Sequence, residues 1–103
     1  MGEATRVPLQ IVTQNVSVVS VNSFTVEFET SQPVSGQIRF GTNYDFVNNH
    51  KLTSAQLILN EKTKHQIVID GLAPQTSYRY QIILRDPQTN EKVESDYYLV
   101  TTL

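Results

Sequence analysis

The stretch that decides the fold is residues 69–80, which read IDGLAPQTSYRY. Asp70 and Gly71 are typical of the end of a strand, and Pro74 fixes the backbone of a turn. After the turn, Tyr78 and Tyr80 begin an alternation of apolar and polar residues, which indicates a half-buried strand. The stretch therefore predicts two strands joined by a tight corner.

The same alternation recurs along the chain, and helical periodicity is nearly absent. It predicts strands at residues 16–21, 24–28, 37–40, 57–59, 66–69, 78–85 and 97–102. Breaks are expected at residues 31–33 and 60–64, and residues 44–56 are open between a short edge strand and a loop. About seven short strands separated by turns predict an all-β fold, a two-sheet antiparallel sandwich of immunoglobulin-like type.

Residues 71–78, GLAPQTSY, resemble the corner between strands E and F of fibronectin type III domains, which reads Gly-Leu-x-Pro-x-Thr-x-Tyr. The resemblance covers residues 12–103 and implies the sandwich topology of that family. It implies that Leu72 closes one end of the sandwich and that Pro74 turns the chain from one sheet to the other. Thr76 takes the threonine position of the pattern. Tyr78 is then expected to have its ring in the core and its hydroxyl bonded to the backbone of the corner.

The chain departs from the family at Phe28, where these domains usually carry a tryptophan and this chain has none. Residues 38–42, IRFGT, are similar to the Val-x-Tyr-Gly-Thr pattern of a subset of the family. That subset includes the domain that precedes the catalytic domain of purple acid phosphatases. The similarity implies an alternative role, as an accessory domain of a metallophosphoesterase or a glycan-degrading hydrolase.

Length and composition limit the remaining possibilities. The 103 residues are expected to form one domain at residues 10–103, preceded by a tail at residues 1–9. A net charge of −2 with no basic block argues against nucleic acid as a partner. No apolar run is long enough for membrane insertion. The absence of cysteine removes disulfides and thiolate chemistry.

The function expected from these observations is a non-catalytic interaction or spacer module. The chain is expected to be an excised part of a larger protein that is secreted or lies at the cell surface. Its expected partners are the neighbouring domains of that protein, and possible further partners are another protein or a polysaccharide.

No residues form a catalytic or metal-binding pattern, so neither an enzyme nor a cofactor is expected. His50 and His65 are fifteen positions apart and are expected to be solvated surface residues. Glu27 and Glu29 are expected on the open face of one strand, where they lack the cleft that a glycosidase needs.

The candidate binding residues lie in two loops and one aromatic pair. The loop at residues 31–35 contains Pro33, and the loop at residues 86–94 contains Asn90 and Lys92. Both loops are expected at the same end of the sandwich.

Tyr97 and Tyr98 are adjacent, so one of them must face outward in a regular strand. Beside Tyr44 and Phe46, an exposed tyrosine would offer a flat platform for a sugar ring or a protein partner.

Overall fold

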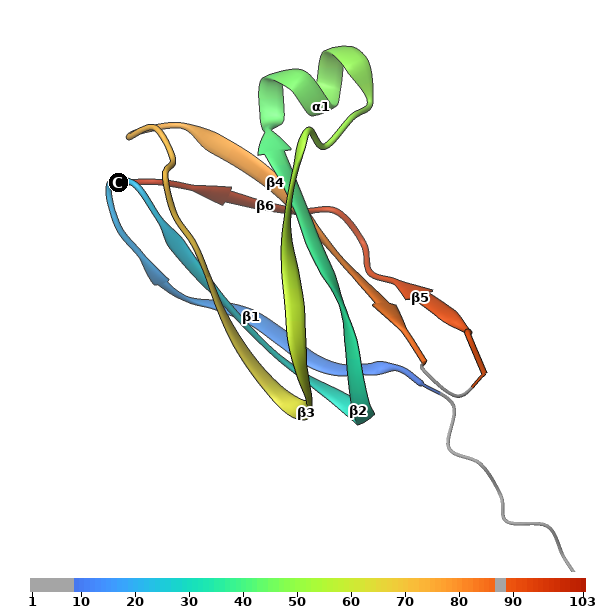
Figure 1. The fold of residues 1–103 in the computed structure, drawn as a ribbon. Coiled ribbons are helices and arrows are strands. Elements are labelled where there is room, and N and C mark those ends of the chain that lie inside the picture. The colour runs from blue at the N-terminus through green and yellow to red at the C-terminus, as the bar shows by residue number, and fades with distance from the viewer. Residues whose placement is uncertain (1–8, 87–88) are drawn as a thin grey trace, which may run out of the picture.

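The computed structural model describes residues 9–86 and 89–103, with the backbone alone for residues 58–62. These residues form six strands and one short helix (Figure 1). The elements are β1 (Ile11–Val19), β2 (Phe24–Thr42), α1 (Asn43–Asn49), β3 (Ser54–Ile69), β4 (Ser77–Arg85), β5 (Lys92–Glu94) and β6 (Tyr98–Thr101). All pairs of described strands are antiparallel. The predicted all-β class is therefore confirmed.

Strand β2 is the element around which the others are arranged. Its first half, residues 24–30, pairs with β1 on one side and with residues 64–69 of β3 on the other. Its second half, residues 34–42, pairs with residues 54–62 of β3 and with β4. Strands β5 and β6 pair in turn with β4. One long strand thus belongs to two parts of the sheet.

The expected breaks at residues 31–33 and 60–64 are wrong, because β2 and β3 each continue through them. Glu29 pairs with Lys64, and the next pair along the two strands is Val34 with Lys62. Strand β2 therefore contains extra residues between Glu29 and Val34. The resulting bulge bends the strand without ending it. Thr30 stabilises the bulge by donating its hydroxyl to the carbonyl oxygen of Gln32 at 2.8 Å.

A helix, α1, occupies part of the segment that was open between an edge strand and a loop. Thr42 caps its N-terminus, with its Oγ1 accepting the backbone N–H of Asp45 at 3.1 Å. His50 ends it in a left-handed conformation, with φ of 54°. Neither expected alternative, an edge strand or a loop, is correct for residues 44–49.

The last predicted strand, residues 97–102, corresponds to β6, whereas β5 lies in the segment at residues 86–94 that was expected to be a loop. Residues 95–97 separate the two strands. Ser95 accounts for the interruption, because its Oγ accepts the backbone N–H of Ile82 at 2.8 Å in place of a main-chain carbonyl. The side chain thereby keeps the interrupted strand attached to β4.

The core contains side chains from both parts of the sheet. Its buried members are Leu9, Phe24, Val26, Phe28, Val34, Ile38, Ile69, Tyr78, Tyr80, Ile82, Leu84 and Val100. Phe24 of the first half of β2 meets Tyr80 of β4 with ring centroids 5.5 Å apart. The Tyr80 hydroxyl donates to Gln14 Oε1 on β1 at 2.6 Å. The two parts of the sheet therefore contribute to one shared core.

The expected tail is described only at its last residue, since residues 1–8 lie outside the described part of the chain. That residue, Leu9, is buried in the core. The packed part of the chain thus includes residue 9.

Gly36 is predicted to be the position in β2 that tolerates substitution least. A Cβ atom there would lie 2.1 Å from the carbonyl oxygen of Ile83 on β4, so the two strands would have to separate. We expect Gly36→Ala to lower the free energy of unfolding by about 1–3 kcal/mol in a urea melt. Ser35→Ala, one position away on the opposite face, is the matched control and should change it little. Equal stability of both variants would contradict the close approach.

Tyr80 is predicted to ionise at a higher pH than an ordinary tyrosine. Burial, and secondly the charge of Tyr98, raise the pKa of Tyr80 from 10.0 to about 12. The stability that comes from a neutral Tyr80 is therefore fully present below pH 10 and is lost as the pH rises from 10 to 12. An ultraviolet titration should show one ionisation step at unusually high pH. This step should disappear in Tyr80→Phe and persist in Tyr44→Phe. A late step that persists in Tyr80→Phe would contradict the assignment.

Candidate functional site

The corner after β3 contains the hydrogen bond that was expected for the Tyr78 hydroxyl. The ring of Tyr78 is buried, and its hydroxyl accepts the backbone N–H of Ala73 at 2.8 Å. Thr76 donates its hydroxyl to the carbonyl oxygen of Pro74 at 2.8 Å. Leu72 is half-buried and packs against the core. These contacts make the corner a structural element.

Thr102 connects this corner to the C-terminal segment, a role that sequence reasoning did not assign. It is buried, accepts the backbone N–H of Thr76 at 3.0 Å and donates to the carbonyl oxygen of Ala73 at 2.7 Å. Its own backbone N–H is bonded to the Thr76 carbonyl oxygen at 3.0 Å. One threonine thus satisfies polar groups on both sides of the turn.

The two expected binding loops lie at one end of the molecule. Gln32 Nε2 donates to Asp86 Oδ2 at 3.4 Å, which brings the segments together. Pro33 is exposed within β2 rather than in a separate loop. Asn90 is exposed with φ of 63°, and its Oδ1 accepts a hydrogen bond from Arg85 at 2.8 Å. Residues 87–88 of the second loop lie outside the described residues.

Lys92 belongs to β5, not to a loop as expected. Its Nζ lies 3.3 Å from Glu94 Oε2 on the same face of that short strand. Both side chains are about half exposed, so this ion pair contributes little to stability.

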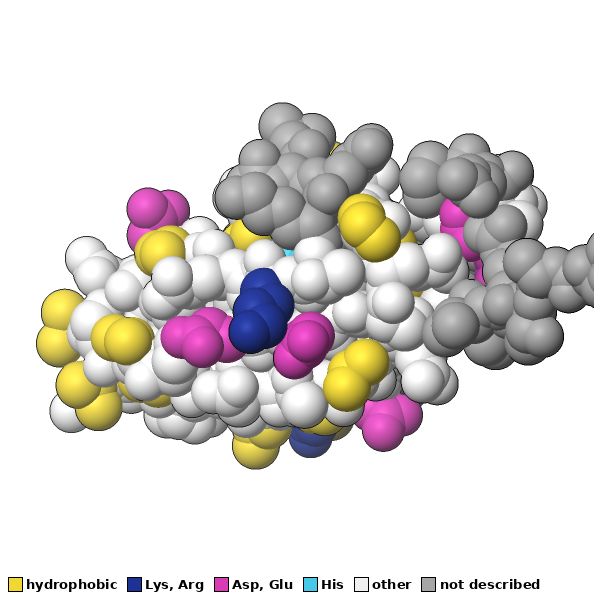
Figure 2. Space-filling model, turned by 90° about the horizontal axis from the view of Figure 1, so that it is seen from below, with side chains coloured by type: hydrophobic (Ala, Val, Ile, Leu, Met, Phe, Trp, Pro, Cys, Tyr) yellow, Lys and Arg dark blue, Asp and Glu magenta, His cyan; other side chains and the backbone are white. Residues whose placement is uncertain are grey.

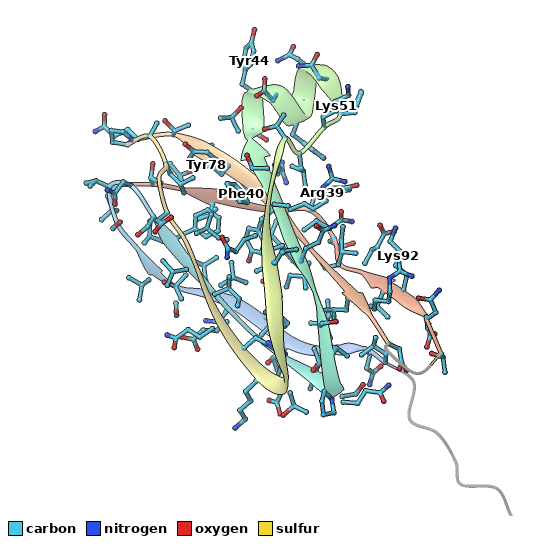
Figure 3. All side chains as sticks on the ribbon, viewed as in Figure 1. Arg39, Phe40, Tyr44, Lys51, Tyr78 and Lys92 are labelled. Atoms are coloured by element: carbon cyan, nitrogen blue, oxygen red, sulfur yellow. The ribbon has the colours of Figure 1, made fainter. Side chains whose placement is uncertain are left out.

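Tyr97 lies beside Phe46 of α1, with ring centroids 4.7 Å apart. The ring planes are tilted by 43° to each other, so the two rings do not form one continuous plane. Tyr97 is 46% exposed, whereas Tyr98 packs against the core. Tyr44 is 75% exposed and points away from the body of the molecule (Figure 3).

Arg79 holds this aromatic pair in place. Its guanidinium lies 5.6 Å from the centroid of the Phe46 ring. Its Nε donates to Asn43 Oδ1 at 2.9 Å, and its Nη1 donates to the Tyr97 carbonyl oxygen at 3.2 Å. One side chain therefore connects α1, β4 and the segment before β6.

Two open hollows lie next to this pair on the outer face of β2 and β4. The first, of about 510 Å³, is lined by Phe46 and Lys51 among others. The second, of about 480 Å³, is lined by Arg85 and Lys92 among others. Arg39, Gln81 and Tyr97 line both, so the hollows are continuous. Of the expected binding residues, Lys92 and Tyr97 share the second hollow, whereas Pro33 and Asn90 are not part of its lining.

The two histidines differ in their exposure to solvent. His50 is exposed at the end of α1. His65 is buried, so the expectation of a solvated residue is wrong for it. It lies opposite Phe28 in the sheet, and the rings stack 4.6 Å apart at 10°. Its position in the inward phase of β3 explains the burial.

Among the described residues, no group of three or more histidines and carboxylates could hold a metal ion. Glu27 and Glu29 are half-buried on β2, and their cross-strand partners on β3 are Gln66 and Lys64.

The described residues contain no helix that is long and apolar enough to cross a membrane.

No protein-family model matches the chain, and no curated protein matches it.

Tyr78 is predicted to contribute more through its ring than through its hydroxyl. Tyr78→Phe removes the bond to Ala73 and should lower the free energy of unfolding by about 1 kcal/mol. Tyr78→Ala also leaves a cavity in the core and should cost about 3–5 kcal/mol. Urea melts of both variants test this. Melts that match the unaltered protein would show that the corner does not stabilise the fold.

Proposed function

We propose that this chain is a non-catalytic interaction and spacer module of a larger protein that is secreted or lies at the cell surface, with a fibronectin type III-like sandwich fold. The corner between residues 72 and 78 carries the proposal. Its tyrosine-to-backbone bond at 2.8 Å and the core shared by two parts of the sheet both support that topology.

The positions of the chain ends support a spacer role. The first described residues and the C-terminus lie at opposite ends of the molecule (Figure 1). Modules connected through such ends follow one another in a row, and each adds its own length. The nine residues of β4 alone span about 30 Å at the usual rise of a strand.

Exposed apolar side chains at the C-terminal end support contact with a neighbouring domain there. Val18, Val21, Val68 and Leu103 are each more than half exposed. They belong to one region, because Val18 and Val68 both pair with Thr25, and the N–H of Leu103 bonds to the Ser20 carbonyl oxygen. Figure 2 shows hydrophobic side chains gathered at this end. An adjoining domain would remove these side chains from water.

A spacer must fold without its neighbours, and this is the first part of the test. The isolated chain should unfold reversibly in a single transition in urea. Poor refolding of the isolated chain would contradict a role as an independent spacer.

The second part uses the longer protein. Val21→Asp at the C-terminal end should weaken contact with the next domain, so small-angle scattering should show a more variable angle between the domains. Val12→Asp is the matched control, because Val12 is 54% exposed against 56% for Val21 but lies at the start of β1. An equal effect of both variants, or none, would contradict a junction at this end.

A further inference from the structure

We propose that the two continuous hollows form a binding groove for an acidic polysaccharide, one whose sugar rings carry carboxylate groups. The groove lies on the outer face of the second half of β2, of β4 and of β5. This inference goes beyond the spacer role and does not depend on it.

The groove concentrates the positive charge of a chain whose net charge is −2. Of its eight lysines and arginines, Arg39, Lys51, Arg85 and Lys92 line the hollows. Figure 3 shows Lys51, Arg39 and Lys92 following one another along the same side of the molecule. Among the described lining residues, Glu94 is the one carboxylate, and Lys92 pairs with it. The groove is therefore suited to an anion.

Among the described residues, the opposite face of the molecule lacks this bias. There Glu29 lies opposite Lys64 in the register of β2 and β3, and Glu27 lies opposite Gln66. Figure 2 shows part of this surface, with a basic side chain between acidic ones. The excess of basic side chains thus belongs to the face of the molecule that carries the groove.

The sheet register sets the spacing of the basic groups. Arg39 lies opposite Gln81, and Arg85 lies opposite Lys92, so the two pairs are four residues apart on β4. That separation corresponds to about 13 Å. Lys51 extends the row beyond Arg39, whose Nη2 donates to the carbonyl oxygen of the adjacent Leu52 at 3.0 Å. A row of this length fits a polymer with repeated charges better than a single small anion.

The aromatic pair favours sugar rings over a peptide. Tyr97 is exposed within the groove and is braced by Phe46, and the apolar face of a sugar ring packs well on such a ring. Gln81 forms part of the floor, with its Nε2 bonded to the Ser95 carbonyl oxygen at 3.0 Å. The second half of β2 and most of β4 are paired on both sides, so these two strands offer no free edge to a peptide in the middle of the groove.

Binding is tested by titrating the intact chain with polygalacturonate, with dextran as the uncharged polysaccharide and poly-glutamate as the acidic peptide. Polygalacturonate should bind, more weakly at higher salt, and tighter than the other two. The proposal is overturned if polygalacturonate does not bind, if dextran binds equally well, or if poly-glutamate binds as tightly.

Matched variants locate the site. The double variant Lys51→Glu with Lys92→Glu should weaken binding about tenfold or more, whereas Lys64→Glu on the opposite face should change it less than about twofold. Tyr97→Ala should weaken binding about fivefold, and the equally truncating Tyr44→Ala should not. Unchanged melting temperatures show that each variant is folded. If Lys64→Glu is as damaging as the double variant, or Tyr44→Ala as Tyr97→Ala, the groove is not the site.

Discussion

The structure depends on the bulge that lets one strand serve two parts of the sheet. Strand β2 pairs with β1 before the bulge and with β4 after it. Strand β3 pairs with β2 both before and after the bulge. Pro33 lies in the bulge and is exposed. Because this residue is not paired with a neighbouring strand, the N–H group that proline lacks is not needed there for a hydrogen bond between strands. Because the strand bends there instead of ending, Phe24 and Ile38 of the same strand both reach the shared core. Both parts of the sheet thus contribute to one core through the same strand.

The far end of this arrangement is closed by hydrogen bonds as well as by the apolar packing of Leu72. The chain leaves β3 and enters β4 across this end, where its backbone polar groups need hydrogen-bond partners. Tyr78 supplies one from the start of β4, and Thr102 supplies others from the C-terminal segment. Both side chains are buried, and the hydroxyl oxygen of each binds the backbone of the corner.

The alternation of side chains predicted the strands well, because it reports which face is buried. It predicted Tyr78 and Tyr80 as core residues, and both are buried. Ile69 and Ile67 are alternate residues on the inward side of their strand. Continuing that alternation to residue 65 would also have predicted a buried His65. Strand ends were predicted poorly, because Pro33 is equally compatible with a turn and a bulge, and register decides between them. The helix had a local signal in Thr42 and Asp45, a capping pair that alternation does not detect.

The candidate groove was only partly accessible from the sequence, for a different physical reason. One of Tyr97 and Tyr98 was expected to face outward, and Tyr97 is the exposed one, beside Phe46. Arg39, Lys51 and Lys92 are scattered over more than forty residues, so no window of the sequence contains a basic patch. They share one face only because β2 and β4 pair in one register, and α1 returns the chain beside Arg39. A shift of one residue would send Arg39 into the core and Ile38 outward. The register that buries the apolar side chains therefore also assembles the charged face.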